Sequence, residues 1–227
     1  MLRLLNRQKT FLGEVRRNFH TTGALVPSSV WLARALARYV DAEGPSRRVL
    51  EAGPGTGSVT RSIIARLRDN DELDLVELNQ RFVEALRHRF EAEDEFRSVA
   101  SRARVLHERV ENVGGQHAYD LIISGLPLNN FQAADVERIM AAFARLLKRG
   151  GILSFFEYVG VRRLRGTIGG HADRQRLSGI GRVLERVFAQ HEIRRDLVLV
   201  NIPPAWVHHV QFERPAFCGN TRAIKVE

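Results

Sequence analysis

The stretch that decides the fold is Glu51-Ala52-Gly53-Pro54-Gly55-Thr56-Gly57, an acidic residue followed by three alternating glycines. Residues 48–51 before the glycines are typical of a short strand, and residues 58–68 after them have helical periodicity. Glycines let the backbone come close to a ligand because no Cβ is in the way, and the free amides of a helix start bind an anionic group. The stretch therefore predicts a strand, a ligand-binding loop and a helix, in that order.

A dinucleotide-binding loop is the first alternative for these glycines. Its fingerprint is G-x-G-x-x-G. Counted from Gly53, the third glycine would fall at Ser58, and counted from Gly55 it would fall at Thr60. Neither residue is glycine, so the spacing disfavours a nicotinamide dinucleotide.

Strands and helices alternate on both sides of the loop. Further strands are expected at 73–78, 103–107, 119–124 and 152–157, and helices at 30–40, 80–90, 133–148 and 173–190, the last broken or bent near Gly179 and Gly181. Residues 193–201 and 205–212 are predicted to form two strands. The connection between them is so short that they can pair only in the antiparallel direction. We therefore expect a Rossmann-like, doubly wound α/β fold: a mostly parallel seven-stranded sheet with a C-terminal antiparallel hairpin and additional N-terminal helices.

The composition limits the partners and excludes some chemistry. The 227 residues carry a formal net charge of +9, which favours nucleic acid, anionic lipid or a phosphate-bearing substrate. Cys218 is the only cysteine, so neither an intrachain disulfide nor a thiolate metal cluster is possible. His208 and His209 are adjacent in a strand and point to opposite faces, and no other histidine spacing indicates a metal. We expect no metal and no membrane-spanning segment.

The first 19 residues predict an amphipathic helix. Leu4, Leu5, Phe11, Leu12, Val15 and Phe19 fall on one arc, and basic residues accompany it: Arg3, Arg7, Lys9, Arg16 and Arg17. Such a helix either packs on the domain or lies in the interface of an anionic membrane. We divide the chain into this helix and its turn, residues 1–27, serving a membrane or lid role, and a main domain, residues 28–227.

The E-x-G-x-G-x-G spacing resembles motif I of class I methyltransferases. The resemblance implies S-adenosylmethionine as cofactor, S-adenosylhomocysteine as product, and a cofactor loop made of Glu51, Gly53, Gly55, Thr56 and Gly57. Glu77 ends the second strand about 20 residues after the glycines, where a carboxylate receives the two ribose hydroxyls, with Leu78 beside it. Glu108, or alternatively Glu111, stands where the family places an acid near adenine.

The loop Ser124-Gly125-Leu126-Pro127-Leu128 follows the fourth strand and should face the methyl group. Amino-methylating relatives often carry Asn-Pro-Pro-Tyr or Asn-Leu-Pro-Tyr here, and this chain lacks both the asparagine and the final aromatic residue. We expect Ser124, Gly125, Leu126 and Pro127 to receive the acceptor, and Ser124 to touch the cofactor as well. Tyr158 and its neighbour Glu157, after the fifth strand, are the first candidates for handling the proton or the cation.

The chain as a whole resembles the bacterial phospholipid N-methyltransferases and, more distantly, the rRNA adenine dimethylases. The resemblance rests on residues 22–29, 51–57, 124–128 and 201–207, the last reading Asn-Ile-Pro-Pro-Ala-Trp-Val. It implies conversion of phosphatidylethanolamine to its mono-, di- and trimethylated forms, with Thr22 and Gly23 at the cofactor. It also implies a monomer in the cytoplasm, held peripherally on the inner face of the cytoplasmic membrane.

Three basic residues after the fifth strand, Arg162, Arg163 and Arg165, suit a lipid phosphate, because the arginine fork matches phosphate geometry. A solvated basic loop is the alternative interpretation. Three other functions stay open: methylation of another amino lipid such as ornithine lipid, N6-methylation of RNA adenine, and a membrane-binding module without activity. An RNA methylase is disfavoured because Leu128 stands where an aromatic residue should stack the base.

Overall fold

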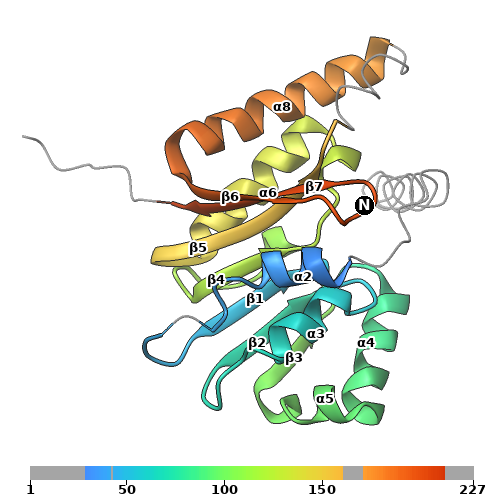
Figure 1. Cartoon of the computed structure of the whole chain (residues 1–227), viewed down its shortest axis with the longest axis vertical. Helices are drawn as coiled ribbons and strands as arrows, with labels where there is room; N and C mark the ends of the chain where they lie inside the picture. The colour runs from blue at the N-terminus through green and yellow to red at the C-terminus, as the bar shows by residue number, and fades with distance from the viewer. Residues whose placement is uncertain (1–28, 42, 161–170, 213–227) are drawn as a thin grey trace, which may run out of the picture.

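A computed structural model describes residues 29–41, 43–160 and 171–212. These residues form a seven-stranded sheet in the order β3-β2-β1-β4-β5-β7-β6, with helices on both faces (Figure 1). The predicted fold class is confirmed. The strands are β1 (Arg48–Ala52), β2 (Glu72–Val76), β3 (Ala103–Leu106), β4 (Tyr119–Ser124), β5 (Leu147–Tyr158), β6 (Glu192–Val198) and β7 (Ala205–Gln211).

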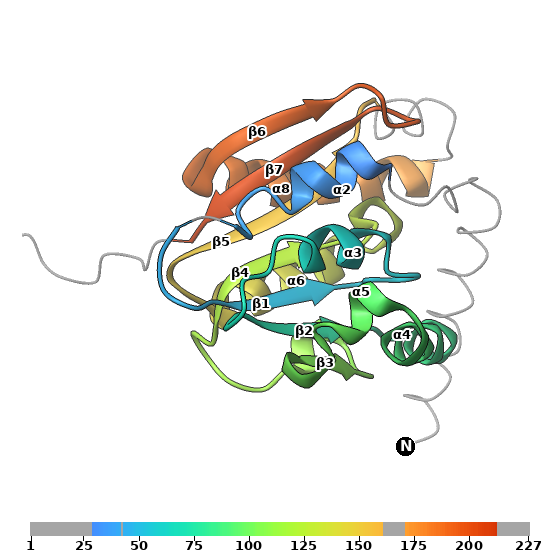
Figure 2. The same ribbon diagram turned by 60° about the horizontal axis from the view of Figure 1, so that its bottom comes forward.

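The helices divide into two layers, one on each face of the sheet (Figure 2). On one face, α2 (Val30–Leu36), α3 (Ser58–Ile64) and α5 (Asp94–Arg97) share a buried apolar cluster with the strands. On the other face, a second cluster is formed with α6 (Ala133–Leu146) and α8 (His171–His191). The remaining helical elements are α4 (Gln80–Ala92), η1 (Ala100–Arg102), η2 (Val110–Asn112) and η3 (Leu128–Asn130).

The central strands are apolar in both side-chain directions because both of their faces are covered. In β1, Leu50 joins the α6–α8 cluster, whereas Val49 joins the α2–α3 cluster. Successive residues of a strand point to opposite faces, so a near-continuous apolar run is needed to fill both cores. This is why the strand at 119–124 could be predicted from its sequence.

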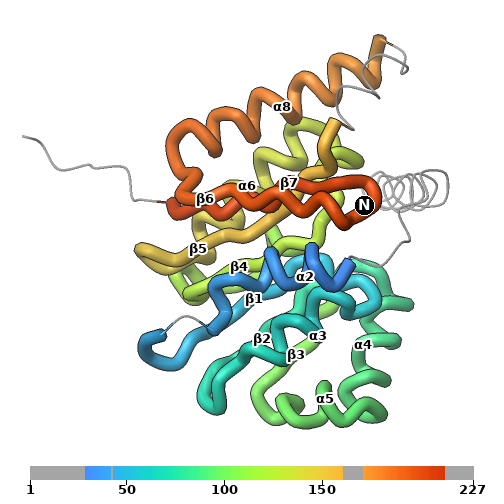
Figure 3. The backbone as a smooth tube through the Cα atoms, in the orientation of Figure 1, coloured from blue at the N-terminus to red at the C-terminus, as the bar shows by residue number. Residues whose placement is uncertain are grey.

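The C-terminal hairpin is antiparallel, as predicted. Strand β7 pairs antiparallel with both neighbours, and Ala205 lies opposite Tyr158 of β5 and Val198 of β6. Since Tyr158 is the last residue of β5, the β6–β7 loop lies at the carboxyl ends of the parallel strands (Figure 3). The hairpin therefore reaches the same edge of the sheet as the glycine loop.

Several boundary predictions are wrong. The helices expected over 30–40 and 58–68 end at Leu36 and Ile64, and the strand expected over 193–201 ends at Val198. The helix expected over 133–148 ends at Leu146, because Leu147 pairs with Tyr119 and begins β5. The break expected near Gly179 is also absent, since α8 runs uninterrupted through it. A Cβ at Gly179 would lie 2.9 Å from the Cβ of Ala133, so this glycine allows α8 to approach α6 rather than ending the helix.

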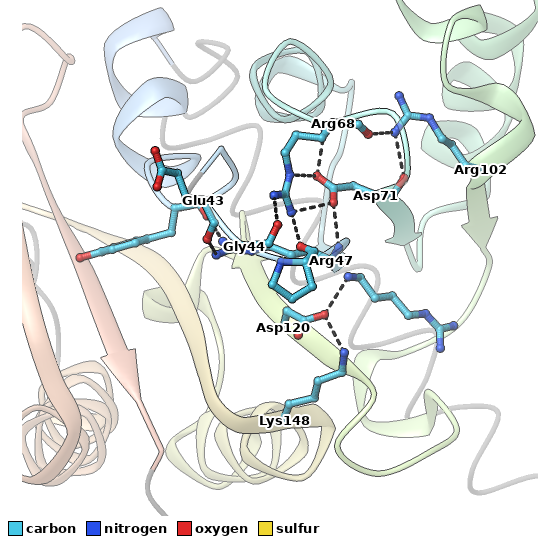
Figure 4. A network of polar contacts seen from close by, with 11 residues as sticks. Glu43, Gly44, Arg47, Arg68, Asp71, Arg102, Asp120 and Lys148 are labelled. Carbon is cyan, nitrogen blue, oxygen red and sulfur yellow. Dashed lines mark hydrogen bonds and ion pairs between the residues drawn. The ribbon is translucent and has the colours of Figure 1, made fainter.

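Ion pairs and hydrogen bonds link the segments that meet at the amino-terminal edge of the sheet (Figure 4). The fully buried Asp71 accepts hydrogen bonds from the backbone amides of Arg47 and Arg68, at 2.7 and 2.9 Å. Asp120 accepts from the Arg48 amide at 2.9 Å and from Lys148 Nζ at 2.8 Å. This edge is thus occupied by structural contacts, and the predicted site residues lie at the opposite, carboxyl-terminal edge.

Candidate cofactor and acceptor site

The glycine loop has the backbone conformation that its sequence requires. Gly53, Gly55 and Gly57 all have positive φ, at +72°, +56° and +84°. Residues other than glycine rarely adopt this backbone region, because their Cβ comes too close to the neighbouring backbone. Gly57 is the N-cap of α3, so the loop joins β1 directly to a helix start, as the sequence predicts.

Glu77 lies against this loop. Its Oε2 accepts a hydrogen bond from the Gly55 amide at 3.1 Å, and its Oε1 accepts one from the Asn79 amide at 2.8 Å. Burial raises the pKa of Glu77, although these backbone hydrogen bonds lower it in part. Each carboxylate oxygen has two lone pairs, so each can still accept a hydrogen bond from a ligand hydroxyl. The arrangement fits a ribose with two adjacent hydroxyls.

Glu51 is a buried acid below the same loop. Its Oε2 accepts a hydrogen bond from Thr60 Oγ at 2.7 Å, whereas Oε1 is buried and has no hydrogen-bond partner among the described residues. Burial and, to a smaller extent, the nearby Glu77 carboxylate raise the pKa of Glu51 to about 8, although the hydrogen bond from Thr60 lowers it in part. A buried acceptor without a partner suits a cationic ligand group, and S-adenosylmethionine carries an ammonium as well as a sulfonium. The residues present therefore fit this cofactor.

The loop after β4 touches the glycine loop. The Gly125 amide donates to the Ala52 carbonyl at 2.9 Å, and the Leu126 amide donates to the buried Ser124 Oγ at 3.3 Å. A Cβ on Gly125 would lie 2.6 Å from the Gly53 carbonyl oxygen. The structure thus brings the predicted cofactor loop and the predicted acceptor loop, including Leu126 and Pro127, into one place. Sequence reasoning missed that Gly125 is needed for this contact.

Arg89 is a second residue that sequence reasoning missed. It donates to the Thr56 carbonyl, pairs with Glu93 at 2.7 Å, and its guanidinium lies 4.4 Å from the centre of the Phe96 ring. A Cβ on Gly57 would lie 2.9 Å from Arg89 Nη1. Arg89 therefore holds the glycine loop from α4. A single arginine in a helical pattern gives no signal of this role.

Strand β3 leads to the part of the site where adenine is predicted to bind. The Glu77 amide donates to the Leu106 carbonyl at 3.0 Å, and His107 Nε2 lies 3.1 Å from the Leu78 carbonyl oxygen. Glu108 lies two residues past the end of β3, and Glu111 lies in η2. Contact of either acid with adenine stays a prediction, as does the role of Leu78.

The end of β5 presents Glu157 and Tyr158 to opposite faces. Phe155 pairs with Ser124 in the register, so Glu157 shares the face of Ser124 and Tyr158 points the other way. The Tyr158 ring lies 5.2 Å from that of Phe156, and burial raises its pKa. The role predicted for Tyr158 stays a prediction.

His208 lies between two carboxylates, which the sequence did not reveal. Its Nδ1 is 2.5 Å from Glu192 Oε1, and its Nε2 is 3.7 Å from Glu157 Oε2. Its ring stacks on Phe188 with centres 4.1 Å apart. The three polar residues come from β5, β6 and β7, so only the strand pairing brings them together.

Several predicted residues lie outside the described residues. These are Thr22 and Gly23, the three arginines at 162, 163 and 165, and the N-terminal helix. Among the residues that the structure describes, no helix is long and apolar enough to cross a membrane. No group of three or more potential metal-binding side chains is found there either.

Residues 49–151 match a protein-family model described as a methyltransferase domain. This part of the chain is a methyltransferase domain. With the sheet order and the glycine loop above, it is of the class I type, and its cofactor is S-adenosylmethionine.

Curated relatives match this methyltransferase over part of their length. An ornithine lipid N-methyltransferase of Singulisphaera acidiphila is 33% identical over 121 residues, which are 53% of this chain and 62% of that protein. The hybrid PKS-NRPS synthetase lepA of Aspergillus flavus is 25% identical over 144 residues, only 4% of its length. The chain therefore spans less than two thirds of the curated relatives it matches.

Solved structures show the same fold at low identity. An N1-methyltransferase for 1,6-didemethyltoxoflavin from Burkholderia thailandensis has a TM-score of 0.60 and 16% identity, covering 92% of this chain and 90% of that one. An O-methyltransferase from Bacillus cereus in complex with S-adenosylhomocysteine has a TM-score of 0.58 and 16% identity, covering 90% and 91%. At this identity the likeness establishes the fold alone.

Proposed function

We propose that this chain is an N-methyltransferase that acts on the amino headgroup of a membrane lipid. The observation that carries the proposal is the 33% identity to an ornithine lipid N-methyltransferase. Ornithine lipid is therefore the first candidate substrate and phosphatidylethanolamine, which the sequence motifs favoured, is the second. Both present a primary amine at a bilayer surface, so both place the same demand on the site.

S-adenosylmethionine supplies an activated methyl group, which leaves the sulfonium sulfur as the new N–C bond forms. Positioning of the amine in line with the breaking S–C bond is the main task of the protein. The buried Ser124 hydroxyl holds the Leu126 amide, which fixes the loop between residues 124 and 127. The backbone carbonyls of this loop and the Ser124 hydroxyl then receive the acceptor nitrogen. Contact of Gly125 with Gly53 keeps the loop beside the cofactor.

The acceptor amine is an ammonium in water and must lose a proton before it attacks. Glu157 lies on the face of Ser124, two residues beyond it in the strand register. Its partner His208 links it toward Glu192, which is less buried. This series of carboxylate, imidazole and carboxylate provides a place for the proton. A partly methylated headgroup is a cation, and the same carboxylate attracts it.

Labelled S-adenosylmethionine and vesicles of defined composition test the proposal. Vesicles containing ornithine lipid or phosphatidylethanolamine should acquire label in that lipid, whereas phosphatidylglycerol vesicles, which have no amine, should not. A Glu77→Gln variant serves as the control for dependence on the cofactor site. Label in ribosomal RNA but in neither amino lipid would contradict the proposal and favour the RNA alternative.

A further inference from the structure

Six large apolar side chains are exposed at the carboxyl-terminal edge of the sheet. We refer to them as the apolar rim: Val30, Trp31, Val159, Leu199, Val200 and Ile202. The exposed fractions reach 68% for Leu199 and 82% for Ile202. Soluble domains normally scatter such residues singly, so a group of them at one edge indicates an interaction site.

The rim is held in place by hydrogen bonds between distant segments. Asn201, in the middle of the β6–β7 loop, is buried; its Oδ1 accepts from the Ser29 amide at 3.2 Å, and its Nδ2 donates to the Pro203 carbonyl at 2.7 Å. The Val159 amide donates to the Pro204 carbonyl at 2.7 Å. Figures 1 and 2 both place the start of α2 beside this loop. The apolar side chains therefore sit on a fixed backbone.

The rim is on the same edge of the sheet as the cofactor and acceptor loops. Val159 directly follows Tyr158 at the end of β5, and the β6–β7 loop begins where β6 ends opposite Ala205. The glycine loop and residues 124–127 follow β1 and β4 at that edge too. A surface that touches the rim is thus next to the place where methyl transfer is proposed.

One basic side chain lies beside the rim at Trp31, and a second lies in β6, four residues before Leu199. The guanidinium of the exposed Arg34 lies 5.4 Å from the Trp31 ring centre, and that of the exposed Arg195 lies 4.7 Å from the Trp206 ring centre. Tryptophan and arginine together are typical of the membrane interface, where the ring sits at headgroup level and the cation meets lipid phosphate. The rim itself contains no charged residue.

We propose that the apolar rim inserts into the surface of an anionic lipid bilayer and so places the acceptor loop over the headgroups. The inference rests on the proposed function, in which the substrate is a bilayer component. A second copy of the chain is the weaker alternative, because a stable interface takes roughly 20–30 residues from each partner and the rim offers far fewer. Coverage of the rim by residues 1–28 of the same chain is the other alternative, and the experiment distinguishes it from contact with a bilayer.

Quenching of tryptophan fluorescence by brominated acyl chains tests direct contact. The full chain has two tryptophans, so a Trp206→Phe background reports Trp31 alone. On vesicles of brominated phosphatidylcholine and phosphatidylglycerol, Trp31 emission should shift to shorter wavelength and be quenched. Replacing Leu199 and Ile202 with Ser should weaken vesicle binding about tenfold for each side chain. Ile193→Ser is the matched control, since Ile193 is also exposed but lies at the opposite end of β6.

The proposal is overturned if Trp31 is not quenched and the double Ser variant binds vesicles like the unaltered chain. It is also overturned if that variant lowers the melting temperature and leaves binding intact, because the rim is then covered by the chain's own residues. Methylation of amino lipid dispersed in detergent micelles reads out the proposed function separately. The rim variants should still methylate lipid in micelles. If the unaltered chain does not methylate lipid in micelles, the proposed function is contradicted but the bilayer contact is not.

Discussion

Glu77 Oε2 accepts a hydrogen bond from the Gly55 amide at 3.1 Å, which ties the end of β2 to the glycine loop after β1. The two residues are 22 positions apart in sequence. The same carboxylate also caps the Asn79 amide, so it is fixed before any ligand arrives. A fixed acceptor loses little conformational entropy when it binds a ribose.

Removing this carboxylate should weaken cofactor binding. Glu77→Ala takes away a charged acceptor for two ribose hydroxyls, and we expect a loss of roughly 2–3 kcal/mol in binding free energy by calorimetry. Glu72→Ala is the control, because Glu72 begins the same strand at the opposite edge of the sheet. Equal affinity in both variants would show that Glu77 is not the ribose acceptor.

Replacing a glycine of the glycine loop should impair cofactor binding, whereas replacing Gly125 should impair folding. A Cβ at Gly55 meets no atom within 4 Å, so the main cost of Gly55→Leu to folding is the left-handed backbone, about 1–2 kcal/mol, while the leucine side chain displaces the cofactor. Gly160→Leu is its control, since Gly160 has a similar φ of +71° and equally open surroundings. Both variants should melt alike, but only Gly55→Leu should lose stabilisation by S-adenosylmethionine.

Gly125→Ala should instead act on the fold. Its Cβ would press on the Gly53 carbonyl at 2.6 Å, where only backbone can move. We expect a loss of about 1–3 kcal/mol in the free energy of unfolding, measured by urea denaturation. A variant as stable as the unaltered chain would mean that the two loops are not in contact.

The acid Glu51 should make stability fall as pH rises. Its pKa is raised from the reference value of 4.5 to about 8, so between these values the folded chain holds a proton that the unfolded chain has released. Stability is therefore lost through this window, at up to about 1.4 kcal/mol per pH unit. Glu51→Gln keeps an acceptor for Thr60 and removes the titration, so its free energy of unfolding should depend less on pH between 5 and 8, as urea titrations at several pH values would show.

Cofactor binding should release a proton at pH 7 if its ammonium lies beside Glu51. The cation would favour the ionised carboxylate, so affinity should rise as pH increases from 6 to 8. Calorimetry in buffers of different ionisation enthalpy measures the proton directly. Glu51→Gln should bind without releasing a proton, and release of the same size in both proteins would place the ammonium elsewhere.

Asp74, in the middle of β2, should matter for stability alone. It accepts hydrogen bonds from Arg104 at 2.7 Å and from the Tyr119 hydroxyl at 2.7 Å. Burial would raise its pKa, but these bonds outweigh burial and hold the pKa below the reference value, so its contribution is lost as pH falls through that lowered pKa. Asp74→Asn should cost roughly 2–4 kcal/mol in unfolding free energy. Asp94→Asn, in an exposed pair with Arg97, should change it by less than about 1 kcal/mol. An equal effect of the two variants would contradict this role.

Local sequence patterns predicted the strands and helices along the chain and the loops that carry the candidate site, but they did not predict contacts between strands. The glycine loop, Glu77 and the antiparallel end of the sheet could be predicted because spacing, buried-strand composition and a short connection each limit the backbone. The His208 contacts with Glu157 and Glu192 arise from strand pairing across the hairpin, and the need for Gly125 arises from contact with the loop after the neighbouring strand β1. Of the break or bend predicted near Gly179 and Gly181, the break is wrong, because a glycine in a helix can serve packing as well as termination.

Lipid extracts of cells expressing the chain, analysed by mass spectrometry, test amino-lipid methylation most directly. Ornithine lipid or phosphatidylethanolamine should gain one to three methyl groups, each a mass increase of one CH₂, and a Glu77→Ala chain should give far less product. An unchanged set of amino lipids, in cells that contain both lipids and the folded protein, would contradict the proposal that this methyltransferase acts on a lipid amine.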